Sequence, residues 1–186
     1  MTNHQKDASL EDQQKTAKVM ERLRAELDNE SRTFKDTADR EWTMDMTIGG
    51  FMRVKAAHGV DLFALDQGDP PLIEVLYSDP VLLAKIIYTL VGHQIDDVDE
   101  LSFCDAMGQD ALWDADRVFR AALIAFFRTA RRPELAETVV ATSALIEIGA
   151  LTGEEELKAV DLATMIEPLR NMIRSDFGKL SGTEPE

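Results

Sequence analysis

The chain has 186 residues, of which 45% are hydrophobic, so it is long enough for one domain with an ordinary buried core. Its formal net charge is −15, from 35 acidic and 20 basic side chains. This surplus disfavours nucleic acid and anionic membranes as partners, because both are bound by clustered Lys and Arg. It suits a protein that stays dispersed in water or meets a basic or polar partner.

The charge is unevenly distributed along the chain. Residues 1–32 carry 6 basic and 7 acidic side chains, whereas residues 33–132 carry 10 and 17, and residues 133–186 carry 4 and 11. We therefore divide the sequence into three parts. These are a polar N-terminal extension (1–32) that is helical or disordered, a helical domain (33–150) that begins with a hairpin, and an acidic C-terminal helical tail (151–186).

Three features bear on the compartment. Cys104 is the only cysteine, so no intramolecular disulfide can form and an oxidising compartment is not implied. The N-terminus lacks the apolar run of a signal peptide. The longest apolar segment, residues 81–91, is interrupted by Lys85 and is too short to cross a bilayer. We expect a cytoplasmic protein.

The first element with a clear pattern is a β-hairpin near residues 33–46. Residues 36–39 (Asp-Thr-Ala-Asp) predict its turn, and after them Trp42, Met44 and Met46 alternate with polar residues, as in a strand. A hairpin is marginally stable alone, so we expect its apolar face to pack on helices. The apolar residues between 19 and 27 have helical spacing, but they bury too little for a stable isolated helix.

Capped amphipathic helices are expected next. A helix from Ile48 to about Ala57 would have Thr47 as its N-cap and Gly59 as its stop. A loop over residues 68–71 and a short helix over residues 72–77 should follow.

The clearest helix start is Asp79-Pro80, with Asp at the N-cap and Pro at the first helical position. Behind it, apolar residues recur at i, i+3, i+4, i+7 and i+8, which predicts the central core helix. These residues are Leu83, Ile86, Ile87, Leu90 and Val91. After an acidic loop, Ser102 and Asp105 predict a capping box.

Two long helices should complete the bundle, one from about Ala111 to Thr129 and one from Pro133 to about Ile148, ended by Gly149. Thr152 and Glu155 predict a further capping box, and Pro168 should kink or split the helix behind it. The expected fold class is therefore mainly α, a small helical bundle with one short β-hairpin.

Residue types that carry chemistry do not combine into a known motif. The possible metal ligands His4, His58, His93 and Cys104 are scattered singly. The acidic loop (Asp96, Asp97, Asp99, Glu100) lacks the alternation and the glycine of an EF-hand. Gly49-Gly50 stands where a phosphate loop would lie but lacks its other glycine and its lysine. Asp105 beside Cys104 should raise the pKa of the thiol, which disfavours a nucleophile. We expect no catalytic, cofactor or metal site, and no enzyme.

Aromatic side chains are the candidates for partner binding. Phe126 and Phe127 are neighbours on a helix and point about 100° apart, so only a wide apolar face buries both. Trp113 lies at the edge of the main apolar stripe. We predict Trp113, Phe126 and Phe127 as partner-binding residues. The basic cluster Arg128, Arg131 and Arg132 should complement the helix dipole, or alternatively contact an acidic partner.

Several segments together resemble tail assembly chaperones of tailed bacteriophages, more narrowly a helical group often encoded just ahead of the tape-measure protein. The similarity covers residues 34 to about 133. It rests on these blocks, in this order: Arg40-Glu41-Trp42-Thr43-Met44, residues 53–63 (RVKAAHGVDLF), Asp79-Pro80-Val81-Leu82-Leu83, residues 103–113 (FCDAMGQDALW) and Ala125-Phe126-Phe127. Arg128 departs from the pattern, since a proline is expected there.

The resemblance implies a non-enzymatic chaperone that binds the tape-measure protein and keeps it soluble until tail-tube subunits polymerise around it. Such a protein acts in the host cytoplasm, is not expected in the mature virion, and could also associate with itself as an oligomer. The alternative is a small acidic structural component of the virion, such as a head- or tail-completion adaptor.

Overall fold

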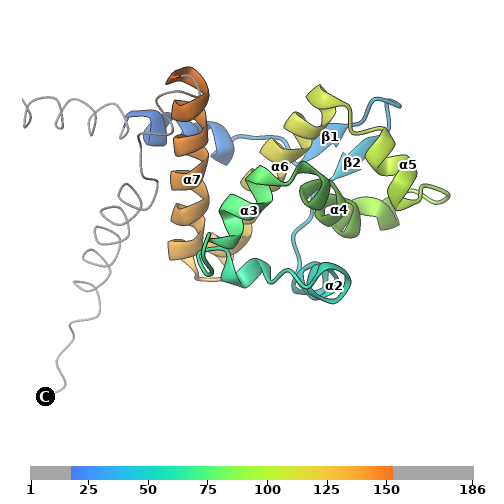
Figure 1. The fold of residues 1–186 in the computed structure, drawn as a ribbon, viewed down its shortest axis with the longest axis horizontal. Helices are drawn as coiled ribbons and strands as arrows, with labels where there is room; N and C mark the ends of the chain where they lie inside the picture. Colours follow the sequence, from blue (N-terminus) through green and yellow to red (C-terminus); the bar gives the residue numbers. More distant parts are fainter. Residues whose placement is uncertain (1–17, 153–186) are drawn as a thin grey trace, which may run out of the picture. The chain divides into compact units, whose positions relative to one another are not determined.

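The structure is a computed structural model that describes residues 18–152. Helices predominate in this part of the chain, together with one two-stranded antiparallel sheet (Figure 1). The predicted class, mainly α with one short hairpin, is confirmed. Contacts divide the chain after Met20 and after Val140. Residues 21–140 thus form one compact unit, and its borders differ from the predicted ones at residues 32 and 150.

A helix over residues 18–28 belongs in large part to this unit. Its Leu23 and Leu27 are buried, and Asp28 forms an ion pair with Arg128. Just beyond the helix, the Glu30 carboxylate lies 2.9 Å from Nε of Arg117. The end of the predicted extension is therefore helical and packed.

The hairpin consists of β1 (Thr33–Lys35) and β2 (Glu41–Thr43), with Phe34 paired with Trp42. Trp42 and Met44 are fully buried, as their alternation predicts, while the strands are shorter than the predicted range. The Gln94 side chain completes the outer edge of β2, because it accepts from Thr43 N (2.9 Å) and donates to Thr43 O (2.6 Å). The outward backbone groups of Thr43 are thus satisfied without a third strand.

Helix α2 (Ile48–His58) begins and ends as predicted. The Thr47 hydroxyl accepts from Gly50 N, and Gly59 adopts φ 71°, a left-handed conformation that favours glycine. A 3₁₀ turn, η1 (Leu62–Ala64), and the short helix α3 (Leu72–Ser78) follow.

Helix α4 (Pro80–Val91) is the centre of the unit. Its N-cap Asp79 accepts from Leu82 N at 2.9 Å, and all five predicted apolar positions are buried. It packs against α2, α3, α5 and α6, and the 3₁₀ turn η2 (Gly92–Gln94) follows it. The prediction of a central core helix is confirmed.

The cap predicted for the next helix was wrong. Helix α5 (Glu100–Asp105) is capped by Asp99, whose carboxylate accepts from Ser102 N at 2.8 Å. Ser102 therefore lies in the first turn and cannot be the cap. Asp99 is the N-cap because its backbone is extended, as at an N-cap, and because its carboxylate accepts a hydrogen bond as well as the Ser102 hydroxyl would.

Helix α6 (Gln109–Thr129) begins two residues earlier than predicted, and α7 (Pro133–Thr152) continues through Gly149. The predicted stop at Gly149 was wrong, since one glycine costs a helix only about 1 kcal/mol. Thr152 is the last described helical residue, whereas Glu155 and Pro168 lie outside the described residues. Taken alone, none of the described helices is long and apolar enough to cross a membrane. Residues 72–78 and 80–94 meet that criterion only jointly, across a 104° bend.

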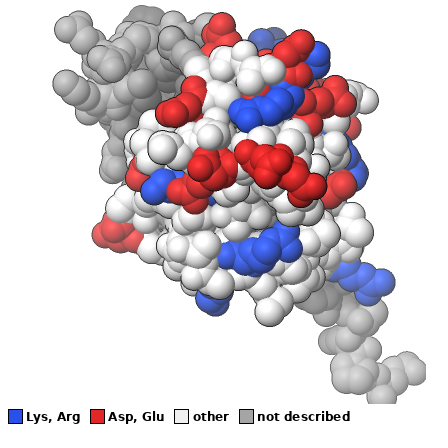
Figure 2. Space-filling model, turned by 90° about the vertical axis from the view of Figure 1, so that its right-hand side faces the viewer, with Lys and Arg blue, Asp and Glu red and all other residues white. Residues whose placement is uncertain are grey.

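On the face shown in Figure 2, most acidic side chains lie in the upper and middle parts, where several basic side chains lie among them, while the lower part carries basic and uncharged side chains.

Candidate partner-binding site

Trp113 on α6 is the most conspicuous aromatic side chain on the described surface. It is 58% exposed, although tryptophan usually buries most of its area. Two turns further along α6, the guanidinium carbon of Arg120 lies 5.9 Å from the centre of the Trp113 ring. The same guanidinium lies 5.7 Å from the ring of Tyr77, at the end of α3. Arg120 is thus held between two aromatic rings from different helices.

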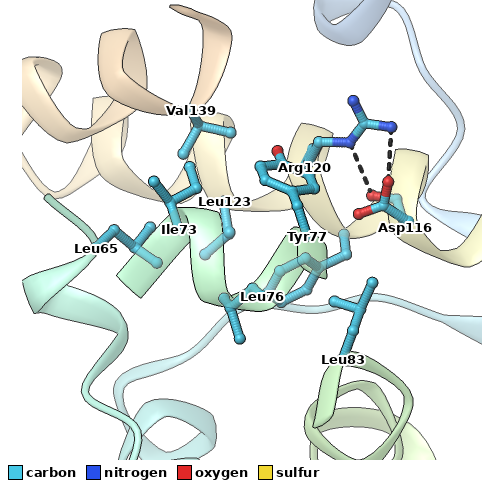
Figure 3. A pocket seen from close by; sticks show the side chains of 10 residues that line it. Leu65, Ile73, Leu76, Tyr77, Leu83, Asp116, Arg120, Leu123 and Val139 are labelled. Carbon is cyan, nitrogen blue, oxygen red and sulfur yellow. Dashed lines mark hydrogen bonds and ion pairs between the residues drawn. The ribbon is translucent and has the colours of Figure 1, made fainter. Parts of the chain in front are cut away.

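The Arg120 side chain is fixed by a buried ion pair with Asp116, one turn earlier on α6. Nη2 of Arg120 lies 2.7 Å from Oδ2 of Asp116, and both side chains are nearly inaccessible (Figure 3). Burial raises the pKa of the Asp116 carboxyl, and the neighbouring guanidinium opposes that rise. The pair keeps Arg120 in one position beneath Trp113.

Behind the ion pair lies a small apolar cavity. Its volume is about 10 Å³, close to the least that holds one water. It is lined by residues of α3, α4, α6 and α7 and by Leu65 at the end of η1 (Figure 3). The apolar lining residues are Leu65, Ile73, Leu76, Leu83, Phe119, Leu123 and Val139. This cavity is too small for a metabolite. Trp113 itself lies on the outer surface.

The arrangement suits a protein partner. Trp, Tyr and Arg are the residue types most enriched among residues that dominate binding energy at protein interfaces. Here they lie on rigid helices, so little side-chain freedom is lost when a partner covers them. The site therefore offers one exposed aromatic anchor, Trp113, supported by Arg120 and Tyr77.

The structure treats the three predicted partner-binding residues differently. Phe127 has an exposed fraction of 0% and lies 6.0 Å from Phe51 and 6.1 Å from Phe63, ring centre to ring centre. It is a core residue, and its predicted role as a surface anchor does not hold. Phe126 is half-buried, with its ring 4.5 Å from that of Phe51. It is 13 residues from Trp113, about 20 Å along the helix, so the two do not form one site.

Sequence reasoning missed Arg120, Asp116 and Tyr77. The spacing of Trp113, Asp116 and Arg120, at i, i+3 and i+7, places all three on one helix face and could have revealed the first two. Tyr77 comes from another helix, and no local pattern predicts its position.

The remaining candidates have structural explanations. Gly50 lies in the first turn of α2, where an added Cβ would come 3.0 Å from Leu90 Cδ2, so it permits close approach of α2 and α4. Within residues 18–152, no group of three or more His, Cys, Asp or Glu side chains is arranged to hold a metal. In the basic cluster, Arg128 pairs with Asp28 and Arg132 with Glu134.

Cys104 is half-buried. Burial is the main reason why the pKa of its thiol is raised, followed by the charge of Glu100; Asp105, the predicted cause, contributes less. A protonated thiol is a poor nucleophile at neutral pH.

Comparison with known proteins adds no relative. No family model matches this sequence, and no curated protein or solved structure is similar to it.

Proposed function

We propose that this chain is a tail assembly chaperone of a tailed bacteriophage, which binds the tape-measure protein and keeps it soluble in the host cytoplasm. The proposal starts from the resemblance over residues 34 to about 133. The structural observation that supports it is the exposed Trp113, held over Arg120 on a rigid helical unit. In this role the protein turns over no substrate and is absent from the finished virion.

Trp113 can contribute substantially to holding an apolar helical client. A tryptophan side chain buries 150–250 Å² when covered, so covering the exposed part here removes on the order of 100 Å² from water. At about 25 cal/mol per Å², this stabilises a complex by about 2–3 kcal/mol. The net charge of −15 would keep such a complex dispersed.

Co-expression with the tape-measure protein tests the proposal. We expect the wild-type chain to move the client into the soluble fraction, and Trp113→Ala to reduce the soluble client several-fold. The reason is that the substitution removes the anchor but little of the core. Val81→Ala is a matched control, because Val81 is also an exposed apolar residue (62%) but lies on α4. Circular dichroism should show that both variants remain folded.

Two results would contradict the proposal. If the client stays insoluble when co-expressed with the wild-type chain, the protein is not its chaperone. Detection of the chain in purified virions by mass spectrometry would favour the alternative, a structural or completion component.

A further inference from the structure

Helix α2 carries an outer face that is apolar and basic on a strongly acidic chain. Ile48 and Met52 are one turn apart on this helix and are 55% and 68% exposed. Arg53 and Lys55 are exposed beside them, and α2 contains no acidic residue. Lys55 is partly neutralised, since its Nζ lies 2.6 Å from the carboxylate of Asp61, which follows the helix. We call Ile48, Met52, Arg53 and Lys55 the α2 face. Its charge is opposite in sign to that of the chain as a whole.

Helix α5 carries the opposite combination. Leu101 is 69% exposed, and Asp105, one turn later, is exposed on the same side of the helix. The preceding loop adds the exposed Asp96 and Asp97, and α5 contains no basic residue. We call Asp96, Asp97, Leu101 and Asp105 the α5 face. Lys85 on α4 neutralises part of the nearby charge, since its Nζ lies 3.8 Å from the Glu100 carboxylate.

The two faces cannot cover each other within one copy. Both helices pack on α4, which lies between them (Figure 1). They belong to the same compact unit of residues 21–140, so their separation is fixed by its core. Within this unit, each face therefore remains open.

We propose that the α2 face of one copy binds the α5 face of a second copy. The α2 face places Ile48 and Met52, and the α5 face Leu101, among charges of one sign, and the two signs are opposite. Such a pair would have an apolar centre and a charged rim, the usual anatomy of a protein interface. Pairing of two α2 faces, or of two α5 faces, would bring like charges together.

The contact is head-to-tail, so each added copy again leaves one α2 face and one α5 face open. Association of this kind grows into a ring or an open chain rather than stopping at a dimer. This self-association needs no client, so its absence would not contradict the proposed chaperone function.

Sedimentation velocity of the full chain over a concentration series tests the inference. The wild type should exceed the mass of two chains as concentration rises, and added salt should weaken association because the rim is charged. Met52→Glu/Arg53→Glu should destroy the α2 face, and Leu101→Lys/Asp105→Lys the α5 face. Both double variants change exposed side chains, so both should fold and remain monomeric.

Mixing the two double variants provides the decisive measurement. Each variant retains the face that the other lacks, so an equimolar mixture should form dimers of twice the single-chain mass and nothing larger. Arg32→Glu, a charge reversal at an exposed residue outside both faces, and Trp113→Ala should associate like the wild type. A wild type that stays monomeric at every concentration would overturn the inference. So would self-association of either double variant, or a mixture that remains monomeric.

Discussion

Asp36 is the residue on which the hairpin turn depends most. Its side chain is completely buried, and its Oδ1 accepts from the backbone N–H groups of Ala38 (2.9 Å) and Arg40 (3.0 Å). Its Oδ2 accepts from Arg40 Nε (2.6 Å) and Trp42 Nε1 (2.9 Å). Burial by itself raises the pKa of this carboxyl, but the hydrogen bonds from Trp42 and Arg40 outweigh that effect and lower the pKa below its ordinary value of 3.8.

We expect Asp36→Asn to lower the free energy of unfolding by about 3 kcal/mol. An amide can replace one oxygen as acceptor, but its NH₂ group would then face the N–H groups of Arg40 and Trp42. Urea denaturation measures the loss. Asp39→Asn is the matched control, because Asp39 is exposed and asparagine tolerates its φ of 63°. Equal stability of the two variants would show that the Asp36 hydrogen bonds contribute little.

The same comparison has a pH dependence. Because the folded-state pKa of Asp36 is lowered, its carboxylate contributes stability above the unfolded pKa and loses it as pH falls through the folded pKa. The difference between wild type and Asp36→Asn should therefore be constant near neutral pH and shrink below about pH 4. A difference that stays constant to the lowest pH at which the protein folds would argue against an ionised Asp36.

At the scale of elements, the two neighbouring glycines at the start of α2 have different surroundings. Substituting each of them therefore distinguishes the effect of packing from that of helix propensity. A Cβ on Gly49 would touch only the ends of Arg53 and Thr47 at 3.8 Å, whereas one on Gly50 would meet Leu90 Cδ2 at 3.0 Å. Leu90 is buried in the core helix α4 and has little room to move.

We expect Gly49→Ala to raise the melting temperature slightly, because alanine favours a helix over glycine by up to about 1 kcal/mol. Gly50→Ala should gain the same propensity but lose about 1–3 kcal/mol to overpacking against α4. Thermal unfolding of the two variants measures the difference, with each serving as the control for the other. Stabilisation by both substitutions would mean that α2 and α4 can separate without cost.

An element can be predicted from the sequence when the residues that determine it are close together in the chain. The caps Thr47 and Asp79 and the apolar stripe of α4 are local patterns, so the sequence alone places them. The predicted cap of α5 was Ser102, and the backbone conformation shows that Asp99, one turn earlier, is the cap. The burial of Phe127 and the pairing of Tyr77 with Arg120 depend on other helices, which no local pattern reveals.

At the scale of the whole molecule, the helix over residues 18–28 shows how a segment that is weak in isolation becomes part of a domain. Its residues carry charges of both signs and bury little by themselves, which is why the sequence predicts an extension. In the structure, Leu27 and Asp28 border a hollow of about 310 Å³ whose other walls include Ala121, Ala122 and Arg128 of α6. Two kinds of interaction could therefore hold this helix, apolar burial and ion pairs.

Apolar burial should dominate. Leu27 is only 5% exposed, so Leu27→Ala should cost about 2–3 kcal/mol through lost transfer energy and a new void. The Asp28–Arg128 pair is partly exposed on both sides, and such pairs contribute at most about 1 kcal/mol. Arg128→Ala should therefore cost much less than Leu27→Ala in urea denaturation, and the stability of the wild type should change little with added salt. Two results would show instead that ion pairs hold this helix against α6. One is a larger loss of stability in Arg128→Ala than in Leu27→Ala. The other is a loss of wild-type stability on adding salt that is as large as the loss in Leu27→Ala.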